Sequence, residues 1–146
     1  MLLELIMNDR PTVPELIAAA RVFLEQELLP ALADARLRFQ TLVAANVLAI
    51  CERELLAEED HLAEEWQRLG ELLDLADAAP ERLSMQREIT RERNTLLCQR
   101  IRAGDFDEPG RFRELCRQLR RAVERKLEVA NPKYLAGFRG ESSARQ

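Results

Sequence analysis

The sequence predicts an all-α protein, an antiparallel bundle of about five helices, from its composition and its hydrophobic spacing. Of the 146 residues, 47% are hydrophobic, 33% are charged and only 5% are aromatic. Abundant Ala, Leu, Glu and Arg together with few Gly favour helices over sheets. Apolar residues recur at helical intervals, and no segment shows the alternation of a strand. A chain of this length buries a core without disulfides or metals.

The expected domain organisation follows from where the helical pattern begins and ends. We expect an N-terminal extension over residues 1–10, a single helical domain over 11–135 and a disordered tail over 136–146. Met7 is a second candidate start, so the residues before it need not belong to the fold. The end of the chain, from Arg139 onward, has no apolar stripe to bury.

The first helix is expected to begin at a capping box. In Thr12-Val-Pro-Glu15 the Thr12 hydroxyl accepts from the amide of Glu15, and the Glu15 carboxylate accepts from the amide of Thr12. Pro14 is tolerated there because amides of the first turn have no partner within the helix. Pro30 then ends or bends the helix.

The second and third helices are expected on either side of an acidic run. The second, from about Arg38 to Leu56, is hydrophobic on nearly every face, which is typical of a central helix enclosed by its neighbours. The run Glu58-Glu-Asp60 suits the positive N-terminal end of the third helix. The apolar seam of the third helix comprises Leu62, Trp66, Leu69 and Leu73.

A connection that contains glycine separates the fourth and fifth helices. The fourth is expected to begin within Asp77-Ala-Ala-Pro80-Glu81 and to end at Arg102, with Gly104 as a left-handed cap. Asp107 is the expected N-cap of the fifth, which stops at Asn131-Pro132. The apolar stripe of the fourth comprises Met85, Ile89, Leu96, Leu97 and Ile101, and that of the fifth Phe112, Leu115, Cys116, Leu119, Val123, Leu127 and Ala130.

The three cysteines, Cys51, Cys98 and Cys116, are expected to be reduced thiols. Their odd number and the absence of a CxxC pair do not suit a disulfide framework, and apolar helical neighbours predict small core residues. The apolar N-terminus is short and has no positive leader. The longest apolar run, residues 42–51, has half the length of a membrane span. We therefore expect a cytoplasmic protein without a membrane segment.

Common chemical motifs are missing from the sequence. Glu58-Glu-Asp-His61 has the Glu-x-x-His spacing of di-iron bundles, but such a site needs two of these motifs and the chain has one His. The glycines form no phosphate-binding loop, and no cysteine has an activating partner at a suggestive spacing. No catalytic residue, metal or cofactor is therefore predicted, and an enzyme is the least favoured function class.

Two polar interruptions of the apolar pattern remain. Asn46 stands alone in the apolar run of the second helix, and Glu92, Arg93 and Asn94 fall where the stripe of the fourth should continue. Buried amides need hydrogen-bond partners, so these residues are expected to meet as a polar layer. That layer either fixes the register of the helices or forms the wall of a small ligand pocket.

The charges are segregated along the chain. Residues 1–80 hold six Lys and Arg against 16 Asp and Glu, a net charge of −10, whereas residues 81–146 hold 16 against ten, a net charge of +6. An Arg ridge on the fifth helix is either a solvated face or a binding face for phosphates or carboxylates. A two-fold dimer would let this ridge face the acidic half of a second copy, so we expect a homodimer. Nucleic acid is not expected, because the pI is near 5.2. The ridge comprises Arg113, Arg117, Arg120, Arg121 and Arg125.

Three blocks of sequence together resemble a known family. They are Arg10-Pro-Thr-Val-Pro-Glu-Leu16, Phe39-x-x-Leu-Val-Ala-Ala-Asn-Val-Leu-Ala-Ile-Cys-Glu-Arg-Glu-Leu55 and Lys126-Leu-Glu-Val-Ala-Asn-Pro-Lys-Tyr-Leu135. The chain resembles, over about residues 9–135, a bacterial family of small helical proteins of unknown function. Genes of that family often lie beside those of acyl-CoA dehydrogenases and aminoglycoside-phosphotransferase-like kinases.

The resemblance implies a non-catalytic accessory protein of an acyl-CoA-linked pathway, with an acyl-CoA dehydrogenase or a kinase-like protein as partner. It emphasises Asn46, Glu52, Arg53 and the turn Asn131-Pro132-Lys133. The alternative is a binding module for a phosphorylated or acyl-CoA-like small molecule, held by the Arg-rich C-terminal half. The residues expected to bind a ligand or partner are Asn46, Arg53, Arg93, Arg113, Arg117, Arg121, Asn131 and Lys133.

Overall fold

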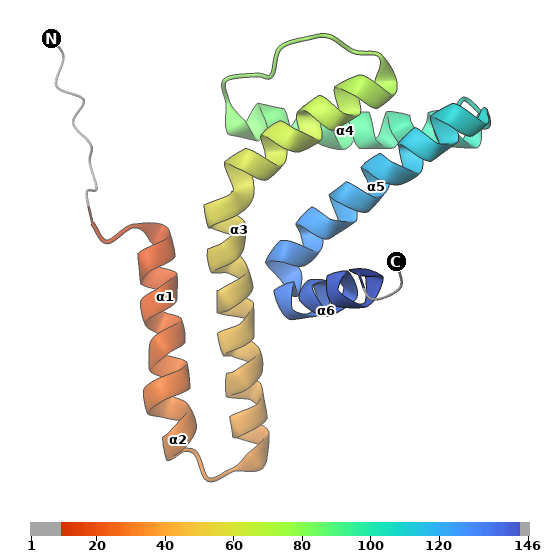
Figure 1. Cartoon of the computed structure of the whole chain (residues 1–146). Coiled ribbons are helices and arrows are strands. Elements are labelled where there is room, and N and C mark those ends of the chain that lie inside the picture. Colours follow the sequence, from red (N-terminus) through yellow and green to blue (C-terminus); the bar gives the residue numbers. More distant parts are fainter. Residues whose placement is uncertain (1–9, 144–146) are drawn as a thin grey trace, which may run out of the picture. The chain divides into compact units, whose positions relative to one another are not determined.

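A computed structural model describes residues 10–143, and all regular secondary structure within this range is helical (Figure 1). This confirms the predicted all-α helical bundle. Almost all of the expected N-terminal extension and the last three residues of the expected tail lie outside the described residues. Contacts divide the chain into two compact units, Met1–Leu56 and Ala57–Gln146. The boundary between the two units falls within the longest helix.

The first unit contains a helical hairpin (Figure 1). One arm holds three successive segments, and the other arm is the first part of a long helix. The three segments are α1 (Val13–Phe23), the π-helical turn η1 (Leu24–Leu28) and the short α2 (Leu29–Ala31). The long helix is α3 (Ala35–Leu73). The Arg21 guanidinium on α1 donates to the carboxylate of Glu52 on α3, with 3.2 Å between Nε and Oε2. This ion pair joins the two arms.

The start and the bend of the first arm follow local sequence. The predicted capping box is confirmed, because the Thr12 amide donates to Glu15 Oε2 at 2.7 Å and the Glu15 amide donates to Thr12 Oγ1 at 3.4 Å. Pro30 lies within the helical arm, directly after the π turn. In a regular α-helix its ring would clash with the carbonyl of Gln26, so the wider π turn accommodates a proline that bends the arm without ending it at once.

A single helix, α3, replaces the predicted second and third helices. It starts at a cap in which Asp34 Oδ1 accepts from the Leu37 amide at 2.8 Å. No Pro or Gly stands between this cap and Gly70, and an acidic run alone does not stop a helix, so the predicted break was wrong. The helix ends where Asp74 adopts a left-handed backbone (φ 58°) and the Leu75 amide donates to the Gly70 carbonyl at 2.9 Å.

The second unit adds three helices: α4 (Leu83–Arg102), α5 (Pro109–Ala130) and α6 (Pro132–Ser143). The predicted start of α4 was too early, because residues 77–81 belong to the loop that precedes the helix. Its end was predicted correctly, since Gly104 is left-handed (φ 88°) and the Asp105 amide donates to the Arg100 carbonyl at 3.1 Å. The N-cap of α5 is Glu108 instead of Asp107, because its carboxylate accepts from two first-turn amides.

The helix α6 contradicts the expected disorder for residues 136–143. Pro132 stops α5, but proline is also favoured at the first position of a helix, and here it starts the next one. Asn131 Oδ1 accepts from the Tyr134 amide at 3.1 Å and caps this start. Leu135, the last residue of the expected helical domain, is buried on α6.

The hydrophobic core lies in the second unit. The predicted seam of the second half of α3 is confirmed at Trp66, Leu69 and Leu73, which are buried. The predicted stripe of α4 is confirmed in its second half, where Leu97 is buried and Leu96 and Ile101 pack against the core. In its first half Met85 is exposed, whereas the polar Gln86, Thr90 and Arg93 are buried. The core cluster comprises Leu69, Leu72, Leu73, Leu97, Phe106 and Leu115.

Several expected core positions are exposed. Among the described residues of the first unit only Ala45 is buried. The prediction that neighbouring helices enclose the helix from about Arg38 to Leu56 was therefore wrong for this chain by itself. The three cysteines are free as expected, but Cys98 and Cys116 are exposed and Cys51 is half-buried. Helical periodicity locates apolar residues on a face and leaves open which neighbour covers that face. No helix in the described part of the chain is long and apolar enough to cross a membrane.

Candidate functional site

A buried arginine organises the contact between α3 and α4. The Arg93 side chain donates to both carboxylate oxygens of Asp77, at 2.5 and 2.6 Å. Its guanidinium carbon lies 3.6 Å from the centroid of the Trp66 ring, a close cation–π contact. The Trp66 indole N–H donates in turn to the Asp77 carbonyl at 3.3 Å. These contacts hold the loop after α3 in place, which explains why α4 starts later than predicted.

The predicted polar layer forms only in part. Glu65 on α3 accepts from Asn94 at 2.8 Å and from Arg68 at 3.1 Å. Asn94 therefore binds α3, as Arg93 does through Trp66. Glu92 is exposed and takes no part in this layer. The expected burial of Asn46 was wrong, since its side chain is exposed on the first part of α3. The contacts of Arg93 and Asn94 favour the structural interpretation over the wall of a ligand pocket.

An open pocket of about 530 Å³ lies beside this layer. Three carboxylates border it, those of Glu71, Asp74 and Asp77, and no Lys or Arg lines it. Because carboxylates repel phosphate, the pocket does not suit the phosphorylated ligand that the sequence predicts as an alternative. The lining residues are Trp66, Gln67, Gly70, Glu71, Asp74, Leu75, Ala76, Asp77 and Ala79.

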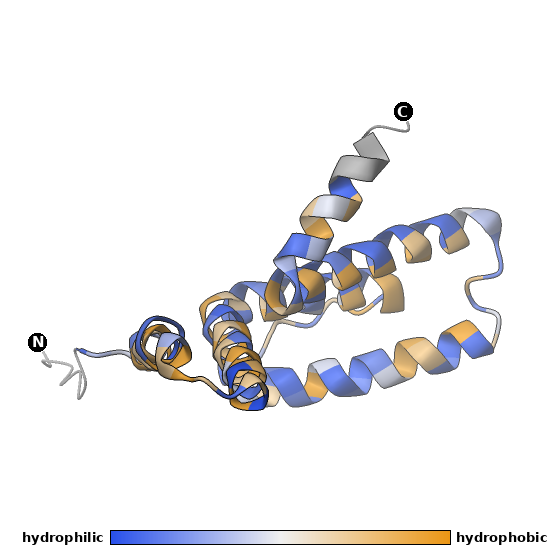
Figure 2. Ribbon diagram, turned by 90° about the horizontal axis from the view of Figure 1, so that it is seen from below, coloured by the Kyte–Doolittle hydropathy of each residue, from blue (hydrophilic) through white to orange (hydrophobic). Residues whose placement is uncertain are grey.

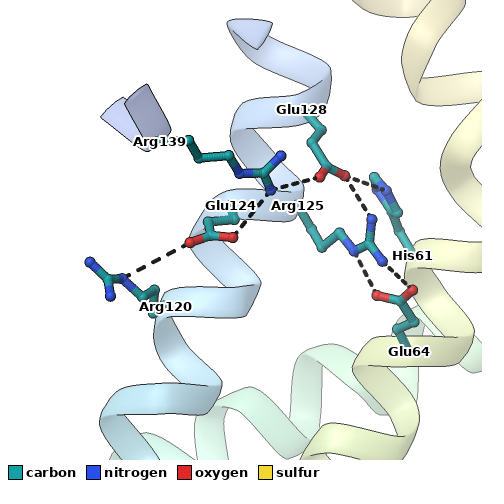
Figure 3. A network of polar contacts seen from close by, with 7 residues as sticks. All are labelled: His61, Glu64, Arg120, Glu124, Arg125, Glu128 and Arg139. Carbon is teal, nitrogen blue, oxygen red and sulfur yellow. Dashed lines mark hydrogen bonds and ion pairs between the residues drawn. The ribbon is translucent and has the colours of Figure 1, made fainter. Parts of the chain in front are cut away.

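A charged network joins α3, α5 and α6 (Figure 3). Arg125 on α5 donates to both oxygens of Glu64 on α3, at 2.7 and 2.5 Å, and to Glu128 at 2.8 Å. Arg139 on α6 donates to Glu128 and to Glu124, each at 3.2 Å. Hydrogen bonds from Arg125, and then from Arg139, hold the pKa of the Glu128 carboxyl below its ordinary value. The network therefore occupies the C-terminal end of the predicted Arg ridge.

His61 lies at the edge of this network and has few possible metal partners. Its Nε2 is 3.7 Å from the Glu128 carboxylate. Within the described range, no group of three or more His, Cys, Asp or Glu side chains is placed to hold a metal ion. Glu58, the first residue of the Glu-x-x-His spacing, forms an ion pair with Arg87 on α4.

The outer surface of α5 combines arginine with exposed apolar residues. Arg113, Arg117 and Arg121 are exposed at successive turns, and Arg117 forms an ion pair with Glu114. Arg113 and Arg121 have no ion pair within the described part of the chain. Of the predicted apolar stripe of α5, Leu115 is buried in the core, whereas most of the other residues are exposed. The exposed apolar residues of α5, called the α5 stripe below, are Phe112, Cys116, Leu119 and Val123.

The remaining predicted site residues do not join one site. Arg53 is half-buried on α3 in the first unit. Asn131 is exposed and has a capping role, and Lys133 is exposed on α6. The sequence reasoning missed Asp77 and Trp66 as partners of Arg93, because nothing in the sequence shows which loop folds back over α4. Only the spacing of Arg125 and Glu128, three residues apart on one helix, signalled part of the network.

The long α3, the polar layer on α4 and the amphipathic surface of α5 define a small all-α protein with an exposed, partly apolar helix side. The chain belongs to the DUF6285 family, a domain of unknown function, whose model matches residues 30–134. This confirms the expected membership in a family of unknown function. No curated protein and no solved structure shows a significant match to the chain.

Proposed function

We propose that this protein is a non-catalytic accessory protein that binds another protein through α5. The observation that carries the proposal is the α5 stripe, four exposed side chains on one side of a helix in a unit that has its own core. Exposed apolar surface bordered by charged residues is typical of a protein–protein interaction site.

The charges beside the α5 stripe indicate the chemistry of the partner. Helical periodicity places Arg113, Arg117 and Arg120 along one edge of the stripe. Arginine binds carboxylates with two parallel hydrogen bonds, so this edge suits a partner helix with an apolar side and acidic flanks. The resemblance to a family encoded beside acyl-CoA dehydrogenases and kinase-like proteins supports one of these as the partner and an acyl-CoA-linked pathway as the setting.

The test uses purified components. The full chain is titrated with the acyl-CoA dehydrogenase, and separately with the kinase-like protein, encoded beside it in its host, by isothermal titration calorimetry. We expect a complex with one of them, and we expect Val123→Asp to weaken it at least about tenfold, because an interface would bury this residue. Arg113→Glu should weaken it through charge reversal. Val13→Asp, at a similarly exposed valine of α1, is the matched control.

A complex that Val123→Asp leaves unchanged, or no complex with either protein, would contradict the proposal. Circular dichroism of each variant separates lost binding from lost folding. The variants expected to weaken binding all lie on α5, and only the control Val13→Asp lies in the first unit of the chain.

A second candidate function is binding of a phosphorylated or acyl-CoA-like small molecule at the same arginines. Arg113 and Arg121, exposed and without an ion pair among the described residues, favour it. Thermal shifts with coenzyme A, acyl-CoA and nucleotides test it, because a ligand at a hundred times its dissociation constant stabilises by about 2.7 kcal/mol. A shift that survives Arg113→Ala and Arg121→Ala together would place the ligand elsewhere.

A further inference from the structure

The side of α3 that points away from α1 is apolar and exposed in the first unit. The α1 side of α3 carries Ala45, which is buried, and Glu52, which pairs with Arg21. The opposite side consists of large apolar side chains that are each between 47% and 66% exposed. This α3 face comprises Phe39, Leu42, Val43 and Val47. Figure 2 shows hydrophobic and hydrophilic residues alternating along the helices.

A hairpin of two helices has no layer to pack against on its outer side. Helical domains are built from packed layers of helices, so an apolar helix side without a neighbour requires a further helix to cover it. The hairpin sequence, residues 10–56, holds five Arg against six Asp and Glu, a net charge of −1. Two copies of this surface therefore do not repel each other strongly.

Asn46 identifies the kind of occupant. By helical periodicity it lies on the α3 face, one turn after Leu42 and directly before Val47, and it is exposed. An amide both donates and accepts, so it is complementary to an identical amide. A single Asn in an apolar helix interface is best known for pairing with its own copy and fixing the register of the two helices.

The charges at the ends of the α3 face agree with an antiparallel pair of identical helices. Arg36 lies ten residues before Asn46 and Glu54 lies eight residues after it, on the same edge of the face. Both are exposed, and neither has an ion pair within the described residues. Pairing about Asn46 brings Arg36 of one copy to within roughly 3 Å along the axis of Glu54 of the other. In a parallel pair in register, Arg36 of one copy would instead lie roughly 27 Å along the axis from Glu54 of the other, too far for an ion pair.

We propose that a second copy of this chain covers the α3 face, with the two α3 helices antiparallel about a two-fold axis at Asn46. The two α3 helices then pack against each other with each α1 on the far side of its own α3, and Asn46 becomes a buried pair. This interface differs from the α5 surface of the proposed function. Each proposal therefore stands or fails by itself.

The first experiment measures self-association of the full chain by sedimentation equilibrium at tens of micromolar. We expect a dimer, and we expect Phe39→Asp to weaken it about a hundredfold, because each copy buries one Phe39. Phe112→Asp, at an exposed phenylalanine of α5, is the matched control and should leave the dimer intact. Circular dichroism shows whether Phe39→Asp keeps its helical content. A monomeric parent, or a dimer lost equally in both variants, would overturn the proposal.

A charge swap tests the orientation even if Phe39→Asp fails to fold. Arg36→Glu and Glu54→Arg should each weaken the dimer severalfold, and the double variant should restore it, because both pairs are re-formed with reversed charges. Restoration is expected only where Arg36 faces Glu54 of the other copy. Two weakening effects that simply add would overturn the antiparallel arrangement.

Cross-linking tests the position of the axis. In a background with Cys51→Ala, Cys98→Ser and Cys116→Ser, we expect Asn46→Cys to be linked to its own copy by a short bis-maleimide. Phe39→Cys is the control, because seven residues along each helix separate it from its copy by roughly 20 Å. Failure of Asn46→Cys to react in a sample that sediments as a dimer would overturn the proposed axis.

Discussion

Arg93 shows how one residue holds a loop and two helices together. Its aliphatic part is buried between α3 and α4, its guanidinium stacks on Trp66, and its charge is matched by Asp77, whose side chain is largely exposed. Removing the arginine leaves Asp77 a carboxylate that water can solvate. Removing the aspartate leaves a buried cation with fewer partners, which is the more costly defect.

We therefore expect Arg93→Ala to lower the free energy of unfolding by about 1–3 kcal/mol, through lost packing and lost cation–π contact. Asp77→Ala should cost at least as much. Arg91→Ala, at an exposed arginine on the same helix, is the control and should change stability by less than about 0.5 kcal/mol. Urea denaturation followed by circular dichroism measures all three. An Arg93→Ala protein as stable as its parent would show that this cluster does not hold the loop.

At the scale of the element, the end of α3 depends on a single backbone conformation. Asp74 has φ 58°, a left-handed backbone conformation that costs free energy for residues other than glycine. Its ion pair with Arg111 is exposed and 3.5 Å long, so it contributes little stability. We expect Asp74→Gly to stabilise the protein by about 0.5–1 kcal/mol and Asp74→Ala to destabilise it. Thermal denaturation of the two variants gives the comparison, and the same sign for both would contradict this account of how α3 ends.

The charged network makes the packing of α3, α5 and α6 depend on pH. The pKa of Glu128 lies below its ordinary value of 4.5 because Arg125 and Arg139 donate to its ionised form. A lowered pKa in the folded state contributes stability that is complete above the ordinary value and is lost as the pH falls through the folded value. Acid should therefore weaken this junction.

We expect Glu128→Gln to be less stable than the parent at pH 7 by about 0.5–1 kcal/mol and the difference to shrink as the pH falls below the ordinary carboxyl value of 4.5. The matched control is Glu59→Gln, at an exposed glutamate of α3 without an ion pair in the described range, which should follow the parent at every pH. Thermal denaturation at pH 7 and below pH 4.5 decides the matter. A constant difference across the range would mean that Glu128 acts through packing and not through its charge.

At the scale of the whole molecule, salt separates two ways of forming a homodimer. The segregated charges, −10 over residues 1–80 and +6 over residues 81–146, predict a dimer in which the Arg ridge faces the acidic half of the other copy. Such a dimer would weaken strongly at 1 M salt, where the Debye length is about 3 Å. The α3 face is mostly apolar, so we expect its dimer constant to fall less than about tenfold. Sedimentation at low and high salt measures the difference, and a dimer that dissociates in salt would favour the ridge.

The helical elements could be predicted wherever a local signal is sufficient by itself. The capping box at Thr12 and the left-handed Gly104 marked helix ends correctly, because these contacts involve residues only a few positions apart. The break near residue 57 and the disordered tail were wrong, since an acidic run does not stop a helix and Pro132 also starts one. At Pro132 the same residue both ends one helix and starts the next, so its type alone did not show which would follow.

The sequence by itself determined the all-α class, the family and the segregation of charge, because composition, short-range hydrogen bonds and helical periodicity are properties of neighbouring residues. Only the tertiary structure decided which side of each helix is covered. It buried Arg93 beside Trp66 and Asp77, and it left Asn46 and the α5 stripe exposed. The physical reason is that an apolar face is buried by whichever surface packs against it, and that surface comes from distant parts of the chain or from another molecule.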